Sequence, residues 1–528
     1  MRRRITFLHK PEDGIDPAAV EVTDSSLTGP VLPTVREERV TLSLEELPDE
    51  LRQLLESSHE LHIRWVSDQS YTSLSPLYSR LSPGFHLFYT PQKGSHAEEN
   101  GQLCAALKKA FGSLDCDTPK ASYSPYDASS LEQSLTLVQA SFTSLPSDRF
   151  SHSTAFQYYQ PLKSLLPFIE YANRDLLPTS KVDDLALASY LDISYDTISH
   201  ALKATATWDY TEERLLVTSP DTKTNRIEVG ILAADKPYGI EPHELGLSGT
   251  LTVLGQDKRP SATIFKFPAR HRQVEGASFS TGYLEPTGLH PALQIRLNGD
   301  AATRPPNADA DDGSHCSLHA YLTLPRAIFA DKYQLSDPLF LASKNLTALR
   351  YITQPVDLEA PDYVLKPWGS AVLLELSPPS SSSSEPAAGA PWTAEVPLHL
   401  RYLSPGPGGY KTVETPYPAV FWACTTEEGT KFPSSPFERV NLGYDGLFGP
   451  RTVFWHVDPA PPQGGDARLI NQVRVPVLDL EKTSWVRGGT AAVVLLGFGW
   501  IVWKLIAVYL RTGYGPEKQM KALEKKEQ

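Results

Sequence analysis

Residues 488–510 read GGTAAVVLLGFGWIVWKLIAVYL, and this stretch sets the chain apart from soluble proteins. It carries a single charge, Lys504, and it meets the requirement of about 20 residues for a helix that crosses a bilayer. Trp500, Trp503 and Tyr509 lie toward its C-terminal end, where membrane helices place interfacial aromatic side chains. We therefore predict one transmembrane helix at 488–510 rather than a buried helix of a soluble domain.

The charge within the predicted span, Lys504, has two interpretations. Its side chain can extend along the helix until the ammonium group reaches the lipid headgroups. Alternatively, the ammonium group makes a polar contact with a transmembrane helix of a partner protein. Lys504 is therefore a candidate partner-contact residue.

Charges on the two sides of the span predict its orientation. The C-terminal side carries Arg511, Lys518, Lys521, Lys525 and Lys526, and the N-terminal side carries Arg474, Lys482 and Arg487. By the positive-inside rule, this bias favours a cytosolic C-terminus and a lumenal body. The N-terminal residues contain no apolar run of signal-peptide length, so a tail-anchored protein with a cytosolic body is the alternative topology.

The chain as a whole is acidic and rich in proline. Its 528 residues include 62 Asp and Glu against 49 Lys and Arg, a formal net charge of -13, and 45 prolines. An acidic balance argues against a nucleic-acid partner, and a hydrophobic share of 41% is too high for a wholly disordered chain. Short strand-like segments separated by turn signals predict a mainly β, sandwich-like lumenal body.

Changes in pattern along the chain predict its domains. The expected parts are an α/β N-terminal region at 1–203, a β-rich domain at 204–480, the transmembrane helix at 488–510 and a cytosolic tail at 511–528. Two low-complexity loops, 299–314 and 377–391, interrupt the β-rich domain, because neither can bury enough apolar surface to become ordered. Within the N-terminal region, residues 183–202 read as mainly helical.

No set of residues converges on catalysis, on a metal or on a cofactor. His59-Glu60-Leu61-His62 resembles a zinc-protease signature, but two histidines on one helical face must be four residues apart. Asp309-Ala310-Asp311 has a cation-binding pattern, yet it lies in an acidic low-complexity loop that is ill suited to rigid metal geometry. We therefore expect no enzyme, with a glycosyltransferase that uses Asp309 and Asp311 as the weaker alternative.

Four cysteines and one glycosylation sequon give information on the cellular compartment of the body. Cys104, Cys116, Cys316 and Cys424 lack the spacing of a zinc site, and they allow one or two disulfides or a reducing compartment equally well. Whether Cys316 and Cys424 pair is left open. Asn345-Leu346-Thr347 is a glycosylation sequon, and an occupied Asn345 would place the body in the lumen.

The second half of the chain contains a run of short phrases in a specific order. They are Gly288-Leu289-His290-Pro291, Leu324-Pro325, Phe329-Ala330-Asp331-Lys332-Tyr333-Gln334-Leu335, Asp357-Leu358-Glu359-Ala360-Pro361-Asp362-Tyr363, Val396-Pro397-Leu398-His399-Leu400-Arg401-Tyr402, Phe421-Trp422-Ala423-Cys424 and Val475-Pro476-Val477. This order, followed by one C-terminal span, resembles the PIG-X family, including its longer fungal members, the protease B non-derepressible proteins. The resemblance covers residues 288–510.

The resemblance implies a function. It implies a non-catalytic subunit of the mannosyltransferase that adds the first mannose to glycosylphosphatidylinositol (GPI) anchor precursors in the endoplasmic reticulum. Its partner would be the multispanning catalytic subunit, PIG-M, beside membrane lipid, and fungal members are also linked to the folding of other proteins there. The chain departs from the shorter family members in lacking a signal peptide and in carrying the two low-complexity loops.

Within these phrases, residue alternation suggests further contacts. His399 and Arg401 alternate with Leu398 and Leu400, which places the polar pair on one face of a strand. That face is either solvated or in contact with the partner, so His399 and Arg401 join Lys504 as candidate partner contacts. The large aromatic side chains of the phrases are predicted to be core residues; they are Tyr333, Tyr363, Phe421 and Trp422.

Overall fold

The computed structural model describes residues 1–126, 154–176, 183–219, 225–236, 238–241, 243–298, 301–305, 316–353, 357–379, 391–426, 435–461, 467–513, 520–521 and 523–526. The chain forms two compact units: the body, Met1–Arg401 with Val413–Val473, and the anchor unit, Tyr402–Thr412 with Arg474–Gln528. Most of the two expected low-complexity loops lies outside the described residues, and so do Asp309 and Asp311.

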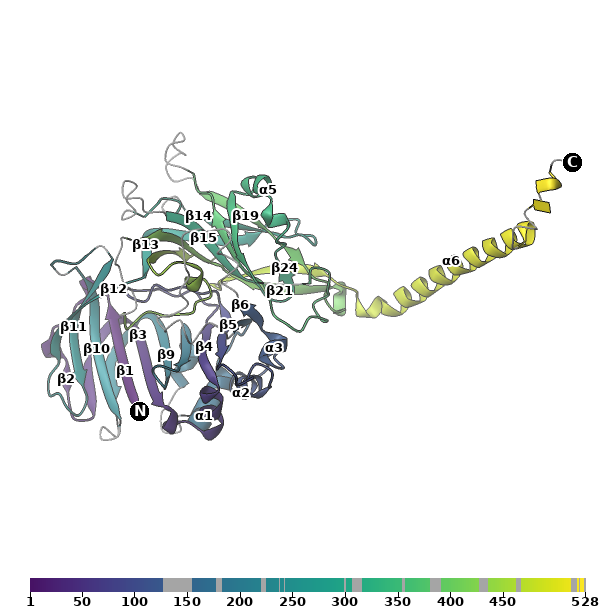
Figure 1. Ribbon diagram of the computed structural model, residues 1–528. Helices are drawn as coiled ribbons and strands as arrows, with labels where there is room; N and C mark the ends of the chain where they lie inside the picture. The colour runs from purple at the N-terminus through teal and green to yellow at the C-terminus, as the bar shows by residue number, and fades with distance from the viewer. Residues whose placement is uncertain are drawn as a thin grey trace. The chain divides into compact units, whose positions relative to one another are not determined.

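The first sheet of the body contains twelve strands, in the order β12-β11-β10-β1-β3-β9-β8-β4-β5-β7-β6, with β2 paired to β3 (Figure 1). Its strands are β1 (Arg2–His9), β2 (Glu21–Val22), β3 (Ser26–Ser43), β4 (Ser58–Val66), β5 (Gly84–Pro91), β6 (Ser124–Tyr126), β7 (Ala155–Gln160), β8 (Tyr190–Asp196), β9 (Ala201–Thr218), β10 (Arg226–Asp235), β11 (Glu244–Val253) and β12 (Ser261–Pro268). The N-terminal strand, β1, lies between β3, which is antiparallel to it, and β10, which is parallel.

Alternation of side chains explains why β1 can occupy the interior of this sheet. Ile5 and Phe7 project from one face into a cluster with Val229 and other apolar residues of β10. Leu8 projects from the opposite face into a second cluster, which contains Leu232. Both faces of β1 are therefore covered, as its nearly continuous apolar run ITFL requires.

The second sheet of the body contains eight strands, in the order β17-β18-β15-β22-β23-β13-β14-β19. Its strands are β13 (His271–Tyr283), β14 (Ala292–Leu297), β15 (Cys316–Thr323), β17 (Leu346–Ile352), β18 (Ala371–Leu376), β19 (Trp392–Pro397), β22 (Ala419–Thr425) and β23 (Thr452–Pro459). Two short sheets pair β16 (Ile328–Phe329) with β20 (His399–Leu400), and β21 (Tyr410–Pro416) with β24 (Ile470–Pro476). Cys316 of β15 lies opposite Cys424 of β22, and the two form a disulfide.

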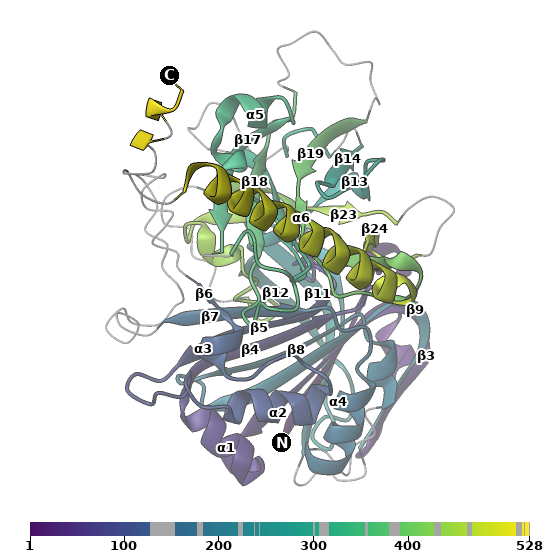
Figure 2. The same cartoon turned by 90° about the vertical axis from the view of Figure 1, so that its right-hand side faces the viewer.

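Helices of the body are short. The α-helices are α1 (Asp49–Glu56), α2 (Gln102–Phe111), α3 (Pro119–Ser122), α4 (Leu166–Tyr171) and α5 (Pro338–Ala342); the shorter turns are η1 (Pro11–Asp13), η2 (Pro17–Ala19), η3 (Leu44–Glu46), η6 (Ala172–Leu176), η7 (Asp183–Leu187), η9 (Gln334–Ser336) and η11 (Asp445–Leu447). α1, α2 and α4 gather beside the first sheet (Figure 2). Phe111 of α2 stacks on Phe168 of α4 and meets Phe85 of β5 edge-on, with ring centroids 4.9 and 5.0 Å apart. The Cys104–Cys116 disulfide closes the segment between α2 and α3.

The two large sheets share one core. Phe85 and Tyr159 of the first sheet belong to the same buried cluster as Tyr321 and Phe421 of the second. Gln157 of β7 also donates a hydrogen bond from Nε2 to the hydroxyl of Tyr321, at 2.8 Å. A mainly β, sandwich-like body with helices in its N-terminal part is confirmed.

One local prediction was wrong, and one boundary stays a prediction. Residues 183–202, expected to be mainly helical, form η7 and then β8, a strand hydrogen-bonded to β4 on one side and β9 on the other. The hairpin with β9 and the long-range pairing with β4 together outweigh the local helical pattern. β9 crosses the expected boundary between 203 and 204, and the division into 1–203 and 204–480 stays a prediction.

The anchor unit contains one long helix, α6 (Thr483–Thr512), with the short turns η10 (Pro407–Gly409) and η12 (Leu480–Lys482) before it. Asp479 precedes this helical segment, and its Oδ1 accepts a hydrogen bond from Glu481 N at 3.1 Å. Gly513 ends α6 with a positive φ of 65°, which a residue without a side chain adopts readily. Residues Leu480–Arg511 are long and apolar enough to cross a membrane, which fits a single-pass membrane protein and the predicted span at 488–510.

Candidate functional site

Segments that are far apart in the sequence meet around residues 398–401 of the body. On one side, Leu398 N and Leu400 N donate to the carbonyl oxygens of Pro291 and Leu289, at 2.9 and 3.0 Å. On the other side, β20 pairs with β16, and Arg401 N donates to a carbonyl oxygen just before β16 at 2.9 Å. Three of the phrases that carried the family resemblance, those beginning at Gly288, Phe329 and Val396, thus form neighbouring parts of the fold.

His399 lies at the centre of this arrangement and is half-buried. Its Nε2 bonds to Gln334 Oε1 at 3.1 Å, and its Nδ1 lies 3.0 Å from Nδ1 of His290. The ring also stacks on Phe329, with centroids 5.4 Å apart. Burial, and then the neighbouring His290, lower the pKa of His399, so the imidazole is neutral at pH 7. We call this group the His399 cluster; its members are His290, Phe329, Gln334, Asp357, Ala360, His399 and Arg401.

Arg401 is an internal support of the His399 cluster. Its side chain is only 2% exposed, and the guanidinium lies 4.3 Å from the centroid of the Phe329 ring. Nη1 donates to the carbonyl oxygens of Asp357 and Ala360, and burial lowers the pKa of the guanidinium. We expected a strand face open to solvent or to a partner, whereas Arg401 is buried and binds its own chain. A partner contact through His399 stays a prediction.

Two aromatic residues of the same phrases are exposed, which corrects the prediction that they are core residues. Tyr333 is 67% exposed and Tyr363 is 62% exposed, whereas Phe421 and Trp422 are buried as predicted. Tyr333 and Tyr363 lie in connecting segments, where no strand period fixes the face of a side chain. Phe421 and Trp422 lie in β22, an interior strand whose two faces are both covered.

The remaining predicted residues lie outside the His399 cluster. Asn345 is exposed between α5 and β17 with a φ of 57°, and its Nδ2 donates to Thr393 O at 2.8 Å. Lys504 is exposed on α6, and its Nζ lies 4.8 and 5.2 Å from the ring centroids of Trp500 and Trp503. Glycosylation of Asn345 and a partner contact through Lys504 stay predictions.

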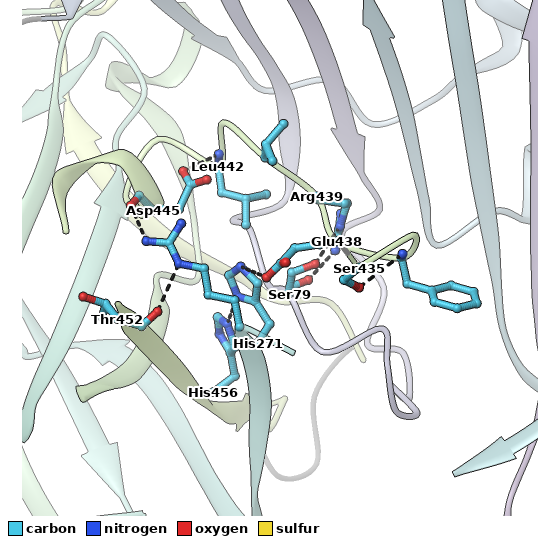
Figure 3. Close-up of polar contacts among 12 residues, drawn as sticks. Ser79, His271, Ser435, Glu438, Arg439, Leu442, Asp445, Thr452 and His456 are labelled. Atoms are coloured by element: carbon cyan, nitrogen blue, oxygen red, sulfur yellow. Dashed lines mark hydrogen bonds and ion pairs between the residues drawn. The ribbon is translucent and has the colours of Figure 1, made fainter. Parts of the chain in front are cut away.

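A second group of polar side chains lies between the two sheets of the body, and Figure 3 shows part of it. We call it the buried polar cluster; its members are Arg64 of β4, Asp192 of β8, His271 of β13, His456 of β23, and Glu438 and Arg439 of the segment before β23. No sequence pattern predicts this cluster. Its members come from distant segments, and they share no motif or spacing that would have signalled it.

An ion-pair arrangement forms one half of the buried polar cluster. The Asp192 carboxylate lies 2.8 Å from Nη1 of Arg64 and 3.5 Å from Nη1 of Arg439. The Arg439 guanidinium also lies 3.9 Å from the centroid of the Tyr190 ring, and its Nε donates to Ser79 Oγ at 2.8 Å. Arg439 therefore fastens the segment that carries it to the first sheet.

A histidine pair and a carboxyl group form the other half. His271 Nδ1 lies 2.9 Å from His456 Nε2, and His271 Nε2 lies 3.9 Å from Glu438 Oε1. Burial lowers the pKa of His456 to about 3 and the pKa of His271 well below its usual value, and it raises the pKa of Glu438 to about 8. All three groups are therefore uncharged at pH 7. Because both histidines are closed to solvent, this geometry fits a structural tie between segments.

Comparisons with known proteins agree with the phrase order. The PIG-X / PBN1 family model matches residues 286–506. The chain is 55% identical over 522 residues to Protein pbn1 of Neurospora crassa, covering 97% of each chain. It is 43% identical over 533 residues to Protein PBN1 of Gibberella zeae, covering 100% of this chain and 99% of the relative. It is 40% identical over 545 residues to Protein pbn1 of Emericella nidulans, covering 98% of each.

Proposed function

Because the chain belongs to the PIG-X / PBN1 family of GPI-anchor accessory proteins, we propose that it stabilises the catalytic subunit of the first mannosyltransferase of GPI-anchor synthesis. The observation that carries this proposal is similarity along the whole chain, 55% over 97% of its length, to a fungal relative of that family. The chain would act by binding the folded catalytic subunit. Because it would bind the folded form and not the unfolded form, it would shift the subunit toward the folded form by mass action. The further implied role, in the folding of other proteins of the endoplasmic reticulum, stays a prediction.

A non-catalytic role is supported by the arrangement of the chain. The mannose donor of this step is attached to a lipid, and a multispanning scaffold normally lines such a site. Within the described residues this chain offers one helix long enough to cross a membrane, α6. The alternative, a glycosyltransferase built on Asp309 and Asp311, is tested by replacing both with Ala; normal complementation would exclude it.

The proposed location is the membrane of the endoplasmic reticulum, with the body in the lumen and the C-terminus in the cytosol. Two disulfides in the body, Cys104–Cys116 and Cys316–Cys424, support this topology, because disulfides persist in oxidising compartments. The alternative is a tail-anchored adaptor with a cytosolic body. Exposure of Asn345 makes the two topologies separable by glycosylation.

An endoglycosidase assay distinguishes these topologies. We expect digestion to increase the gel mobility of the wild-type chain and to leave the mobility of Asn345→Gln unchanged. A second readout covers the case in which Asn345 is unmodified: protease added to intact microsomes should spare a lumenal body and remove only the tail. Digestion of the body in intact microsomes would contradict the proposed topology.

The function is tested by purification from membranes in mild detergent. The affinity tag is placed at the C-terminus, beyond α6, so that this helix separates it along the chain from the strands of the body. We expect a multispanning mannosyltransferase subunit to be recovered with the chain, and we expect its steady-state amount to fall when the chain is depleted. Recovery without that subunit, under conditions that preserve other membrane complexes, would argue strongly against the proposed function.

A further inference from the structure

The surface around the His399 cluster exposes large apolar side chains. Besides Tyr333 and Tyr363, which are more than 60% exposed, Leu289 and Leu358 are also exposed. Each of the four belongs to a segment that contributes to the His399 cluster or directly adjoins it. Exposed tyrosines in such a setting are typical of protein interfaces, where they serve as large anchors with few rotatable bonds.

Both tyrosines are held by segments that are already ordered. Tyr333 N donates to Asp331 Oδ1 at 2.8 Å, and Tyr333 O accepts a bond from Ser336 Oγ at 2.8 Å. The segment around Tyr363 is held by Arg326, whose Nη1 donates to Leu365 O at 3.0 Å. Since these loops are fixed before binding, little conformational entropy is lost when a partner docks.

Charges of both signs lie on this surface: Lys366 is exposed, and Arg326 forms an ion pair with Asp362 at 3.4 Å. The carboxyl-bearing side chains of the described segments are Asp331, Asp357, Glu359 and Asp362. Lys332 lies over the ring of Tyr333, at 5.1 Å from its centroid, and Arg401 is buried. Anionic lipid headgroups attract dense clusters of lysine and arginine, whereas the lysines of these described segments, Lys332 and Lys366, are interspersed with carboxylates such as Glu359. This surface suits a protein segment in which apolar side chains are flanked by basic residues.

Connectivity joins this surface to the membrane anchor. Arg401 is the last residue of the body before the anchor unit, which begins with Tyr402. Within the anchor unit, Gly406 N donates to Leu478 O, and Leu480 N donates to Gly406 O, just before α6. Because one chain carries both this surface and the membrane-spanning helix, a partner in the same membrane meets the surface at a raised effective concentration.

We infer that the exposed surface of the His399 cluster binds an extramembrane loop of the multispanning subunit. Apolar side chains of that loop would pack against Tyr333 and Tyr363, and basic residues of the loop would face Glu359. This inference rests on the proposed function, because it identifies the place where that partner docks. His399 and Arg401 act as positioning residues that hold the loops, and the tyrosines make the contact.

The test is recovery of the named mannosyltransferase subunit with the tagged full-length chain from detergent-solubilised membranes. We expect the double variant Tyr333→Ala/Tyr363→Ala to lower recovery by about tenfold or more, as the loss of two interface anchors does. The matched control is Tyr238→Ala, at a fully exposed tyrosine of the first sheet's connections, which should leave recovery unchanged. Non-reducing electrophoresis and limited proteolysis report whether each variant is folded.

A charge variant keeps the inference testable if the double variant fails to fold. Glu359→Lys should lower recovery several-fold more than Glu12→Lys, a reversal at an exposed glutamate far along the chain. If Tyr333→Ala/Tyr363→Ala and Glu359→Lys both recover the subunit as well as the wild type does, the inference is overturned and the proposed function is left intact. Failure of the wild type itself to recover the subunit would contradict the proposed function instead. A double variant that loses self-association but retains the subunit would also overturn the inference, because the occupant would then be a second copy.

Discussion

The buried polar cluster and the exposed surface of the His399 cluster both depart from the usual pattern of apolar side chains inside and polar side chains outside. The first places two arginines, an aspartate, a glutamate and two histidines between sheets, and the second leaves tyrosines and leucines in solvent. Burying charge costs free energy unless the partners are present, whereas an exposed apolar side chain costs little in an isolated protein. The buried polar cluster therefore serves the fold, whereas the surface of the His399 cluster leaves large apolar side chains accessible to a partner.

The largest effect is expected from breaking the ion pairs of the buried polar cluster. Asp192→Asn removes the carboxylate shared by Arg64 and Arg439, and it should lower the free energy of unfolding by about 3–5 kcal/mol, because two arginines remain buried without their partner. Thermal unfolding of the full chain in detergent measures the loss. Asp184→Asn, which removes a largely exposed partner of Arg36, is the control and should cost at most about 1 kcal/mol. Equal effects of the two variants would show that burial of the Asp192 pairs adds nothing.

A smaller effect, about 2 kcal/mol between pH 6.5 and 8, should come from Glu438. Burial raises its pKa from 4.5 to about 8, so between these values the folded state holds a proton that the unfolded state releases. The stability from this group is therefore complete below pH 4.5 and is lost as the pH rises to 8, by about 1.4 kcal/mol per pH unit. Glu438→Gln should flatten the fall in stability between pH 6.5 and 8, measured by denaturant unfolding.

Histidines of the same cluster act in a different pH range. The pKa of His456 is lowered from 6.5 to about 3, so its contribution is lost as the pH falls below 6.5 and leaves the alkaline range untouched. Burial also raises the pKa of Glu37, so the contribution of Glu438 is the difference in slope between the wild type and Glu438→Gln. An unchanged slope in Glu438→Gln would mean that the carboxyl group reaches solvent or gains a partner in solution.

The smallest effect on stability is expected from the binding surface. Tyr333→Ala removes an exposed side chain that makes few internal contacts, and it should change the free energy of unfolding by less than about 0.5 kcal/mol. Denaturant unfolding of the full chain is the measurement. A loss comparable to that of Asp192→Asn would mean that Tyr333 supports the fold, and the contrast between the two regions would collapse.

Sequence patterns predicted the features that depend on local composition. The apolar span that became α6 and the burial of Phe421 and Trp422 follow from length, hydropathy and strand alternation. β8 was missed although it forms a hairpin with β9, in which Asp196 lies opposite Ala201; its other pairing, with β4, joins distant segments and leaves no local signal. The burial of side chains in connecting segments was also predicted wrongly. Tyr333 and Tyr363 lie outside helices and strands, so no periodic pattern assigns their side chains to a buried or an exposed face.

The two candidate sites differ in how much the sequence could indicate. Phrase order pointed to the residues of the His399 cluster, although only the fold shows that Arg401 turns inward to hold two carbonyl groups. The buried polar cluster was invisible, since residues such as Asp192 and Arg439 are joined only by the packing of the two sheets. Ion pairs between distant segments cannot be inferred from a single sequence.

The position of β1 has a consequence for the biosynthesis of the chain. Arg2 of β1 is paired with Arg226 of β10, so β1 cannot acquire one of its neighbours until the growing chain has passed β10. At roughly 5–20 residues per second, that delay lasts some tens of seconds. During this time one edge of the apolar strand β1 is unpaired. Because unpaired strand edges on a nascent chain are prone to aggregate, such chains are bound by chaperones. A protein proposed to protect another during assembly would thus need protection of its own while it is being made.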